Sequence, residues 1–131
     1  MKEQQLFDWL KEHKFPDLVH SPETYDGFDC TSEEHKMFIE LKSRRTHYPE
    51  LLIEKMKFDF LLSESAKLGL TPWYINWTPE GIFAFNLLSL DENVGMNWIE
   101  KWLPSTTEFA NKNNKMKLVG FIHQDLGFKL V

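Results

Sequence analysis

Several residue types on which common enzyme sites depend are scarce in this chain. Its single cysteine, Cys30, excludes an intramolecular disulfide and a zinc cluster built from cysteines, and it indicates a reducing compartment. The five histidines show no HxH or HxxxH spacing, so a histidine metal centre is not expected, and His47 is the one worth testing. A glycine-rich phosphate loop and a GxSxG elbow are both absent.

Long hydrophobic runs are lacking as well. Residues 1–14 alternate charged with apolar side chains, so we expect neither a signal peptide nor a membrane anchor, and we expect a cytoplasmic protein. Apolar residues nevertheless make up 42% of the 131 residues, which is too many for a disordered chain. The length and the absence of repeats or linkers predict a single domain over residues 1–131.

The charge distribution is uneven. A formal net charge of -5 argues against binding of nucleic acid by bulk electrostatics alone. Residues 36–57, however, contain six Lys and Arg against three Glu, and a second basic cluster comprises Lys112, Lys115 and Lys117. Because such clusters are usually solvated surface charge, they do not by themselves predict a partner.

Hydrophobic periodicity predicts three helices and six strands. The expected helices are 2–14, 49–69 beginning at Pro49, and a short one at 95–103 on Trp98 and Trp102. The expected strands are 25–31, 37–43, 72–78, 82–88, 115–122 and 127–131. The order is close to α-β-β-β-α-β and predicts a mixed α/β (α+β) fold around one sheet. Whether the segment near Tyr74 or that near Phe85 pairs with the first hairpin stays open.

The chemistry is carried by the hairpin 25–43. On a strand, Glu40 and Lys42 point to one face and Leu41 to the other, and both charged groups are costly to bury unless a cation or each other compensates them. If Glu33 and Glu34 centre the turn, Asp29 lies opposite Phe38 and shares the face of Glu40. A loop one residue longer or shorter selects Asp26 instead, so Asp26 is not excluded.

Two carboxylates and an amine on one face suit phosphodiester hydrolysis. The carboxylates are hard ligands for Mg²⁺, with Mn²⁺ able to substitute, and the metal lowers the pKa of a bound water. Lysine would stabilise the attacking hydroxide or the transition state. Glu3, on the Phe7 side of the first helix, is a candidate further ligand, and Arg44 and Arg45 are placed to grip flanking phosphates.

The motif of Asp29, ten intervening residues and Glu40-Leu41-Lys42 resembles the PD-(D/E)XK nuclease superfamily, over roughly residues 1–88. The run from Phe38 to Arg44 looks most like archaeal and phage Holliday-junction resolvases and small phage endonucleases. The chain departs from the pattern at Phe28, where the superfamily commonly has proline.

The resemblance implies a restriction-endonuclease-like αβββαβ core with a C-terminal β-rich extension. It implies Asp29, Glu40 and Lys42 as catalytic residues, a magnesium site at Asp29, Glu40, Leu41 and Glu3, and Lys55 as a further contact to nucleic acid. It also implies a DNA endonuclease of phage or mobile-element origin that forms a homodimer.

Two alternatives stay open. The fold could persist as an inactive module that binds nucleic acid or a protein partner, or Glu40 and Lys42 could be an ordinary ion pair in an unrelated α+β protein. The substrate is equally open among a four-way junction, a branched end, a duplex site and RNA. Trp98 and Trp102, one helical turn apart, are expected to pack in the core, with base stacking as the lesser alternative.

Overall fold

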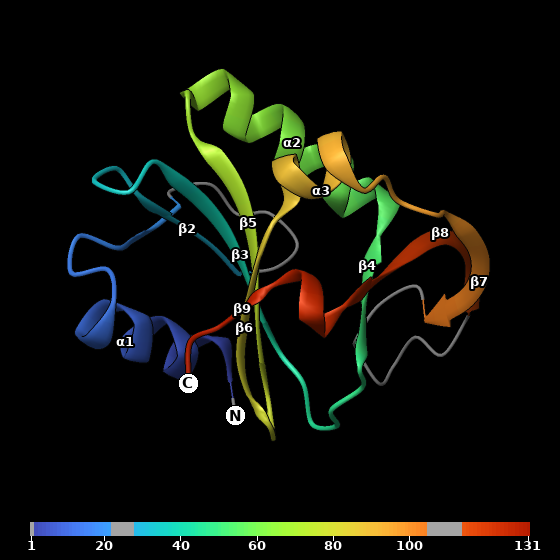
Figure 1. Cartoon of the computed structure of the whole chain (residues 1–131), viewed down its shortest axis with the longest axis horizontal. Helices are drawn as coiled ribbons and strands as arrows, with labels where there is room; N and C mark the ends of the chain where they lie inside the picture. The colour runs from blue at the N-terminus through green and yellow to red at the C-terminus, as the bar shows by residue number, and fades with distance from the viewer. Residues whose placement is uncertain (1, 22–27, 105–113) are drawn as a thin grey trace.

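The computed structural model describes residues 2–21, 28–104 and 114–131 (Figure 1). A six-stranded sheet has the order β1-β2-β3-β5-β6-β9, and a three-stranded sheet has the order β4-β8-β7. The large sheet consists of β1 (Val19–His20), β2 (Phe28–Ser32), β3 (Met37–Ser43), β5 (Thr71–Thr78), β6 (Gly81–Asn86) and β9 (Phe128–Lys129). The small sheet consists of β4 (Glu50–Glu54), β8 (Asn114–His123) and β7 (Ile99–Pro104). The helices are α1 (Glu3–His13), α2 (Lys55–Leu68) and α3 (Leu87–Asn93), with a 3₁₀ turn η1 (Gln124–Leu126).

The large sheet is covered on both faces, as expected for a mixed α/β fold. In Figure 1 it is seen nearly edge-on, with α1 on one side and α2, α3 and the small sheet on the other. Leu6, Phe7 and Leu10 of α1 pack against one face, in a core that also contains Ile39 and Leu41 of β3. The opposite core contains Phe38 and buries Phe58 and Leu61 of α2, Leu87 and Leu90 of α3, and Leu51 and Ile53 of β4. Among the described residues, no helix is both long and apolar enough to span a membrane.

The central strand pair decides which segment joins the first hairpin. β5 lies parallel to β3, with Tyr74 beside Glu40, and β6 then pairs antiparallel with β5. A parallel pair needs a long crossover, which β4 and α2 provide. The segment near Tyr74 is therefore the one that pairs with the hairpin.

The first hairpin differs from its predicted register by two residues. Asp29 lies opposite Glu40, not Phe38, because the closing pair is Ser32 with Met37 and the loop holds four residues. Lys36 adopts φ 55 at the end of that loop, and the Ser32 hydroxyl accepts a hydrogen bond from the His35 N–H. A shift of two keeps every side chain on its predicted face, since strand side chains alternate with period two.

Three element predictions were wrong. Residues 50–54 form β4 instead of the start of a helix at Pro49, because Leu51 and Ile53 pair with Ile122 and Gly120 of β8. Residues 99–104 form β7 instead of a helix, and this strand also pairs with β8. The strand predicted at 82–88 ends at Asn86, whose side chain caps α3 by accepting a hydrogen bond from the Ser89 N–H.

Candidate active site

Two carboxylates face each other on neighbouring strands. Asp29 of β2 and Glu40 of β3 are directly opposed, and the two residues are 6% and 4% exposed. Opposed side chains on antiparallel strands lie on one face with their Cβ atoms about 5 Å apart. The face is the one covered by α2, since Phe38, two residues before Glu40, packs there.

Most of the oxygens of this pair are buried without a partner. Within the described part of the chain, Asp29 Oδ1, Asp29 Oδ2 and Glu40 Oε2 have no hydrogen-bond donor. Buried carboxylate oxygens are normally compensated by donors or by a cation, because their desolvation is costly. This donor set, with hard oxygens close together and three of them unpartnered among the described residues, fits a divalent cation such as Mg²⁺.

The environment of Glu40 disfavours its charged form. Burial raises the pKa of Glu40 well above its usual range, the hydrogen bond that only protonated Glu40 can donate to Asp29 and the negative charge of Asp29 raise it further, and Lys57 and Lys42 lower it. Without a cation, Glu40 therefore keeps its proton to a higher pH than an ordinary glutamic acid does. A cation that binds there must displace this proton.

Lys42 and Leu41 occupy the positions that the motif predicts. Lys42 is half-buried at the end of β3, on the same face as Glu40, and it acts on Glu40 electrostatically. Leu41 points to the opposite face, where its side chain is buried in the core beneath α1. Leu41 can therefore reach a cation only through its main-chain carbonyl.

The lysine of α2 that faces the site is Lys57, not the predicted Lys55. Lys57 Nζ lies 3.6 Å from Glu40 Oε1. Lys55 instead pairs with Asp59 at 2.6 Å, one helical turn along. The sequence carried a signal for this, because Lys55 is four residues before an acidic residue whereas Lys57 is four residues before Leu61, which is buried.

The two arginines that follow β3 differ in their surroundings. Arg44 donates hydrogen bonds to Asn76 Oδ1 at 2.7 Å, to the Leu52 carbonyl at 2.7 Å and to the Tyr74 hydroxyl at 2.8 Å. It thus ties the large sheet to β4. Arg45 is exposed, so of the two it is the better placed to meet a phosphate.

Two of the predicted ligands are not part of the described pair. Glu3 begins α1, which packs on the opposite face of the large sheet, and it does not form a three-carboxylate group with Asp29 and Glu40 among the described residues. Glu3 stays a prediction that would need approach around the sheet edge. Asp26, the alternative to Asp29, lies outside the described residues.

A second group of ligand atoms lies at the hairpin turn. Oxygen and nitrogen atoms of Asp17, Glu34 and His35 are within 4.8 Å of one another, but the Asp17 carboxylate already accepts hydrogen bonds from the Ser32 hydroxyl and the Glu34 N–H. His47 is also engaged, since its ring nitrogens contact Thr78 Oγ1 at 2.8 Å and Gln124 Oε1 at 2.7 Å. His47 therefore has a structural role, because it links Thr78 at the end of β5 to Gln124 of η1.

The whole architecture is similar to that of a solved nuclease. The Holliday junction resolvase Hjc of the archaeon Archaeoglobus fulgidus superposes with a TM-score of 0.60 at 14% sequence identity, covering 98% of this chain and 88% of that one. The fold is restriction-endonuclease-like. Neither a protein-family model nor a curated protein sequence matches the chain.

The similarity reaches beyond the segment that carries the motif. The motif resemblance covered roughly residues 1–88, whereas the superposition includes almost the entire chain. The C-terminal strands are thus part of the shared architecture. At this identity the likeness establishes the fold, and the chemistry has to be argued from the residues.

Proposed function

We propose that this chain is a metal-dependent endonuclease that cleaves phosphodiester bonds of DNA, including branched or junction DNA. The observation that carries the proposal is the opposed pair of Asp29 and Glu40, buried with three carboxylate oxygens that lack donors in the described part of the chain. The similarity to a Holliday junction resolvase supports junction DNA as a substrate. A homodimer, a phage or mobile-element origin and a cytoplasmic location belong to the same proposal, and the single buried cysteine agrees with a reducing compartment.

Asp29 and Glu40 would hold Mg²⁺, or Mn²⁺ in its place, with the main-chain carbonyl of Leu41 as a further ligand. When bound, the cation supplies Lewis-acid chemistry: it lowers the pKa of a water and neutralises negative charge on the phosphate. The carboxylates can also orient a water that attacks phosphorus. Their burial strengthens each electrostatic interaction, because the local dielectric constant is lower than that of water.

The lysines have separate tasks. Lys42, on the same face as Glu40, would donate hydrogen bonds to the attacking water or to a phosphate oxygen as charge builds up there. Lys57 partly neutralises Glu40 in the absence of a cation, across the 3.6 Å contact. An inactive scaffold that had lost its chemistry would not need two opposed carboxylates of which three buried oxygens lack donors among the described residues, which is why we favour an enzyme.

Cleavage assays with a labelled four-way junction and a linear duplex test the proposal. Wild-type protein should cut in Mg²⁺ or Mn²⁺ and not in EDTA. Asp29→Asn should weaken metal binding, with partial rescue at high Mn²⁺, whereas Lys42→Ala should lower the single-turnover rate by about 10²-fold or more without changing metal affinity.

The matched control is Glu92→Gln, an exposed position on α3, which should behave as wild type. Full activity of both Asp29→Asn and Lys42→Ala would show that these residues do not form the active site. Equal rescue of both variants by metal would refute the role proposed for Lys42. Cleavage in EDTA would show that the reaction needs no divalent cation.

A further inference from the structure

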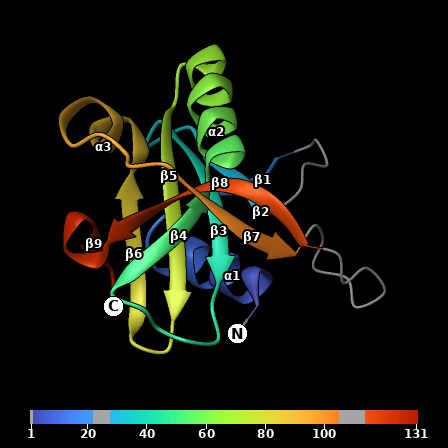
Figure 2. The ribbon, with the colours of Figure 1, turned by 90° about the vertical axis from the view of Figure 1, so that its right-hand side faces the viewer.

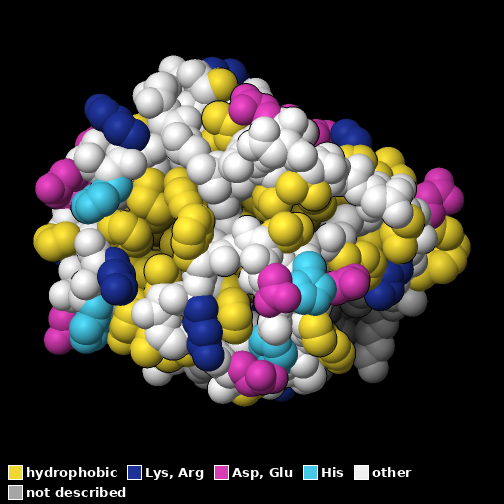
Figure 3. All heavy atoms as spheres, viewed as in Figure 1, with side chains coloured by type: hydrophobic (Ala, Val, Ile, Leu, Met, Phe, Trp, Pro, Cys, Tyr) yellow, Lys and Arg dark blue, Asp and Glu magenta, His cyan; other side chains and the backbone are white. Residues whose placement is uncertain are grey.

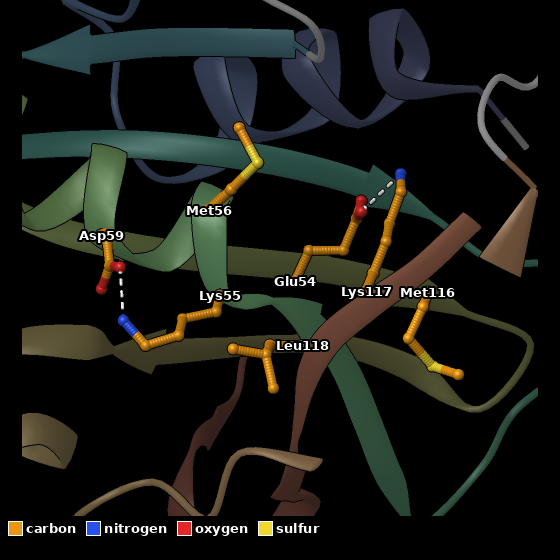
Figure 4. A pocket seen from close by; sticks show the side chains of 7 residues that line it. All are labelled: Glu54, Lys55, Met56, Asp59, Met116, Lys117 and Leu118. Atoms are coloured by element: carbon orange, nitrogen blue, oxygen red, sulfur yellow. Dashed lines mark hydrogen bonds and ion pairs between the residues drawn. The ribbon is translucent and has the colours of Figure 1, made fainter. Parts of the chain in front are cut away.

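The antiparallel pair of β7 and β8 lies on the same side of the large sheet as the carboxylate site. In Figure 2 both strands run across the large sheet on the side of α2, and β3 passes behind them. Glu54 is the last residue of β4, and its carboxylate forms an ion pair with Lys117 of β8 at 2.7 Å. Figure 4 shows these two side chains extending toward the arrowhead of β3, the strand that ends at Ser43. We call residues 99–103 and 115–118 the arm.

One face of the arm is basic. Lys101 of β7 and Lys117 of β8 are directly opposed and so share a face, together with Lys115, which is opposite Leu103. Like charges directly opposed on neighbouring strands destabilise a sheet. Glu54 and the Phe121 ring, 5.3 Å from Lys101 Nζ, offset this only in part. An anion bound along this face would remove the repulsion.

The other face of the arm is exposed and mostly apolar, with Glu100 opposite Leu118 as its charged residue. Trp102 is opposite Met116, and Leu118 follows on the same face. The Trp102 side chain is 61% exposed, whereas Trp98, predicted to pack with it, is partly buried against Phe58. Hydrophobic side chains gather over β7 and β8 at the right-hand end of Figure 3. Core packing was thus the wrong prediction for Trp102.

A groove of about 300 Å³ adjoins this apolar face, between β8 and the first turn of α2. Its apolar lining comes from Met56, Met116 and Leu118, and its charged lining from the ion pairs Lys117–Glu54 and Lys55–Asp59 (Figure 4). Apolar surface with charged groups at its margin suits a planar, uncharged base attached to an anionic backbone.

We propose that the arm grips DNA next to the cutting site, with the phosphates on Lys101, Lys115 and Lys117 and an unpaired base stacked on Trp102, so that branched DNA is preferred over continuous duplex. This inference rests on the proposed nuclease function, since it names the substrate feature that the same site would use. Aromatic stacking requires a base freed from its pair, and a pair opens at lower cost at a branch point, where stacking between neighbouring pairs is interrupted, than within a continuous duplex.

A second copy of this chain is the less favourable occupant. β7, like β4, is an edge strand of the small sheet among the described strands, so a two-fold dimer through its edge is geometrically open. Such a dimer would bring identical lysine rows together, and their repulsion would oppose it. DNA carries the complementary charge.

The test is equilibrium binding in EDTA, where no metal-dependent cleavage occurs, to a synthetic four-way junction and a linear duplex of equal length. Trp102→Ala should bind the junction roughly 5- to 100-fold more weakly and the duplex within about twofold of wild type, and Trp102→Phe should recover most of the loss. Phe128→Ala is the matched control, because Phe128 is an equally exposed aromatic residue on the distant strand β9.

Lys101→Ala should weaken binding to both DNAs and lower the slope of log affinity against log salt by roughly 0.9. Lys129→Ala is its matched control, since each of these lysines lies over a phenylalanine ring, at 5.3 and 5.9 Å. Unchanged junction preference in Trp102→Ala, or equal salt slopes for the two lysine variants, would overturn the proposal.

Sedimentation of Trp102→Ala tests whether a second copy of this chain, instead of DNA, occupies the apolar face of the arm. If this variant turns a dimer into a monomer while DNA binding is unchanged, the face is an interface between copies and the proposal is wrong. The outcome is separable from that of the nuclease proposal: junction-selective binding through the arm without cleavage in Mg²⁺ or Mn²⁺ would refute only the nuclease. Metal-dependent cleavage with unchanged junction binding in the arm variants would refute only the proposed role of the arm.

Discussion

Replacing Glu40 by glutamine should stabilise the protein in the absence of metal. Glu40 is 4% exposed, and its Oε2 atom has no donor among the described residues. At neutral pH the folded protein must either hold a buried charge beside Asp29 or keep a proton on Glu40, and both cost free energy relative to the unfolded chain. Glutamine removes that cost while keeping nearly the same shape.

The size of the effect follows from the burial. Replacing a buried charge by a neutral group of similar volume is worth about 2 kcal/mol in other proteins. For a chain of 131 residues this corresponds to an increase in Tm of roughly 5–10 °C. The Lys57 contact loses its ionic partner in this variant, so the gain lies toward the lower end.

The stabilisation should also depend on pH in a defined direction. Because the pKa of Glu40 is raised on folding, the folded state holds a proton that the unfolded state has released, between the unfolded pKa and the folded one. In that window the unfolding free energy of the wild type falls as pH rises. The advantage of Glu40→Gln should therefore be small near pH 4 and should grow toward neutral pH.

Thermal unfolding in EDTA at several pH values measures this, followed by titration with Mg²⁺ or Mn²⁺. Wild-type protein should gain about 2.7 kcal/mol at a metal concentration of roughly 100 times Kd, and Glu40→Gln should gain much less. Glu92→Gln, exposed on α3, should match the wild type throughout. A lower Tm for Glu40→Gln in EDTA would refute the reasoning, because it would mean that the carboxylate is compensated in the metal-free protein.

Three further variants test other parts of the structure. Lys57→Ala removes a positive charge 3.6 Å from Glu40, so the pH midpoint of Mn²⁺ binding, measured by calorimetry, should move upward. Lys55→Ala should leave this midpoint unchanged, because Lys55 pairs with Asp59. Equal shifts in the two variants would contradict the assignment of Lys57 to the site. Arg44→Ala should lower the unfolding free energy by about 2–4 kcal/mol in denaturant titrations, because three hydrogen bonds are lost. The control Arg45→Ala, at an exposed position, should lower it by about 0.5 kcal/mol or less. Gly69→Ala should cost about 1 kcal/mol, because φ is 70 at the end of α2, and an unchanged Tm would argue against that conformation.

Local rules were sufficient for much of the candidate site. The alternation of side chains along β3 places Glu40 and Lys42 on one face in any register, and Leu41 on the other. The same rule allowed the face of Asp29 to be predicted, although its partner was wrong, because the error was two residues. Gly69 ends α2 as expected, since a left-handed C-terminal residue is a local requirement.

Contacts between distant segments decided the rest. Leu51 and Ile53 fit a helix or a strand by pattern, and only pairing with β8, far along the chain, selects the strand. Residues 99–104 also pair with β8 and form a strand, so the helical spacing of Trp98 and Trp102 was misleading. Once α2 begins at Lys55, its phase against the large sheet turns Lys57 toward Glu40.

The sequence by itself therefore determined which side chains share a face, because that depends on the period of a single strand. It did not determine which charged groups lie buried together, because burial depends on the layers that close over the sheet. Only the tertiary structure places α2 over the two carboxylates and leaves three of their oxygens without donors among the described residues. Likewise, only the pairing of β7 with β8 exposes Trp102 and opposes Lys101 to Lys117, since hydrogen bonds between strands form irrespective of their separation in sequence.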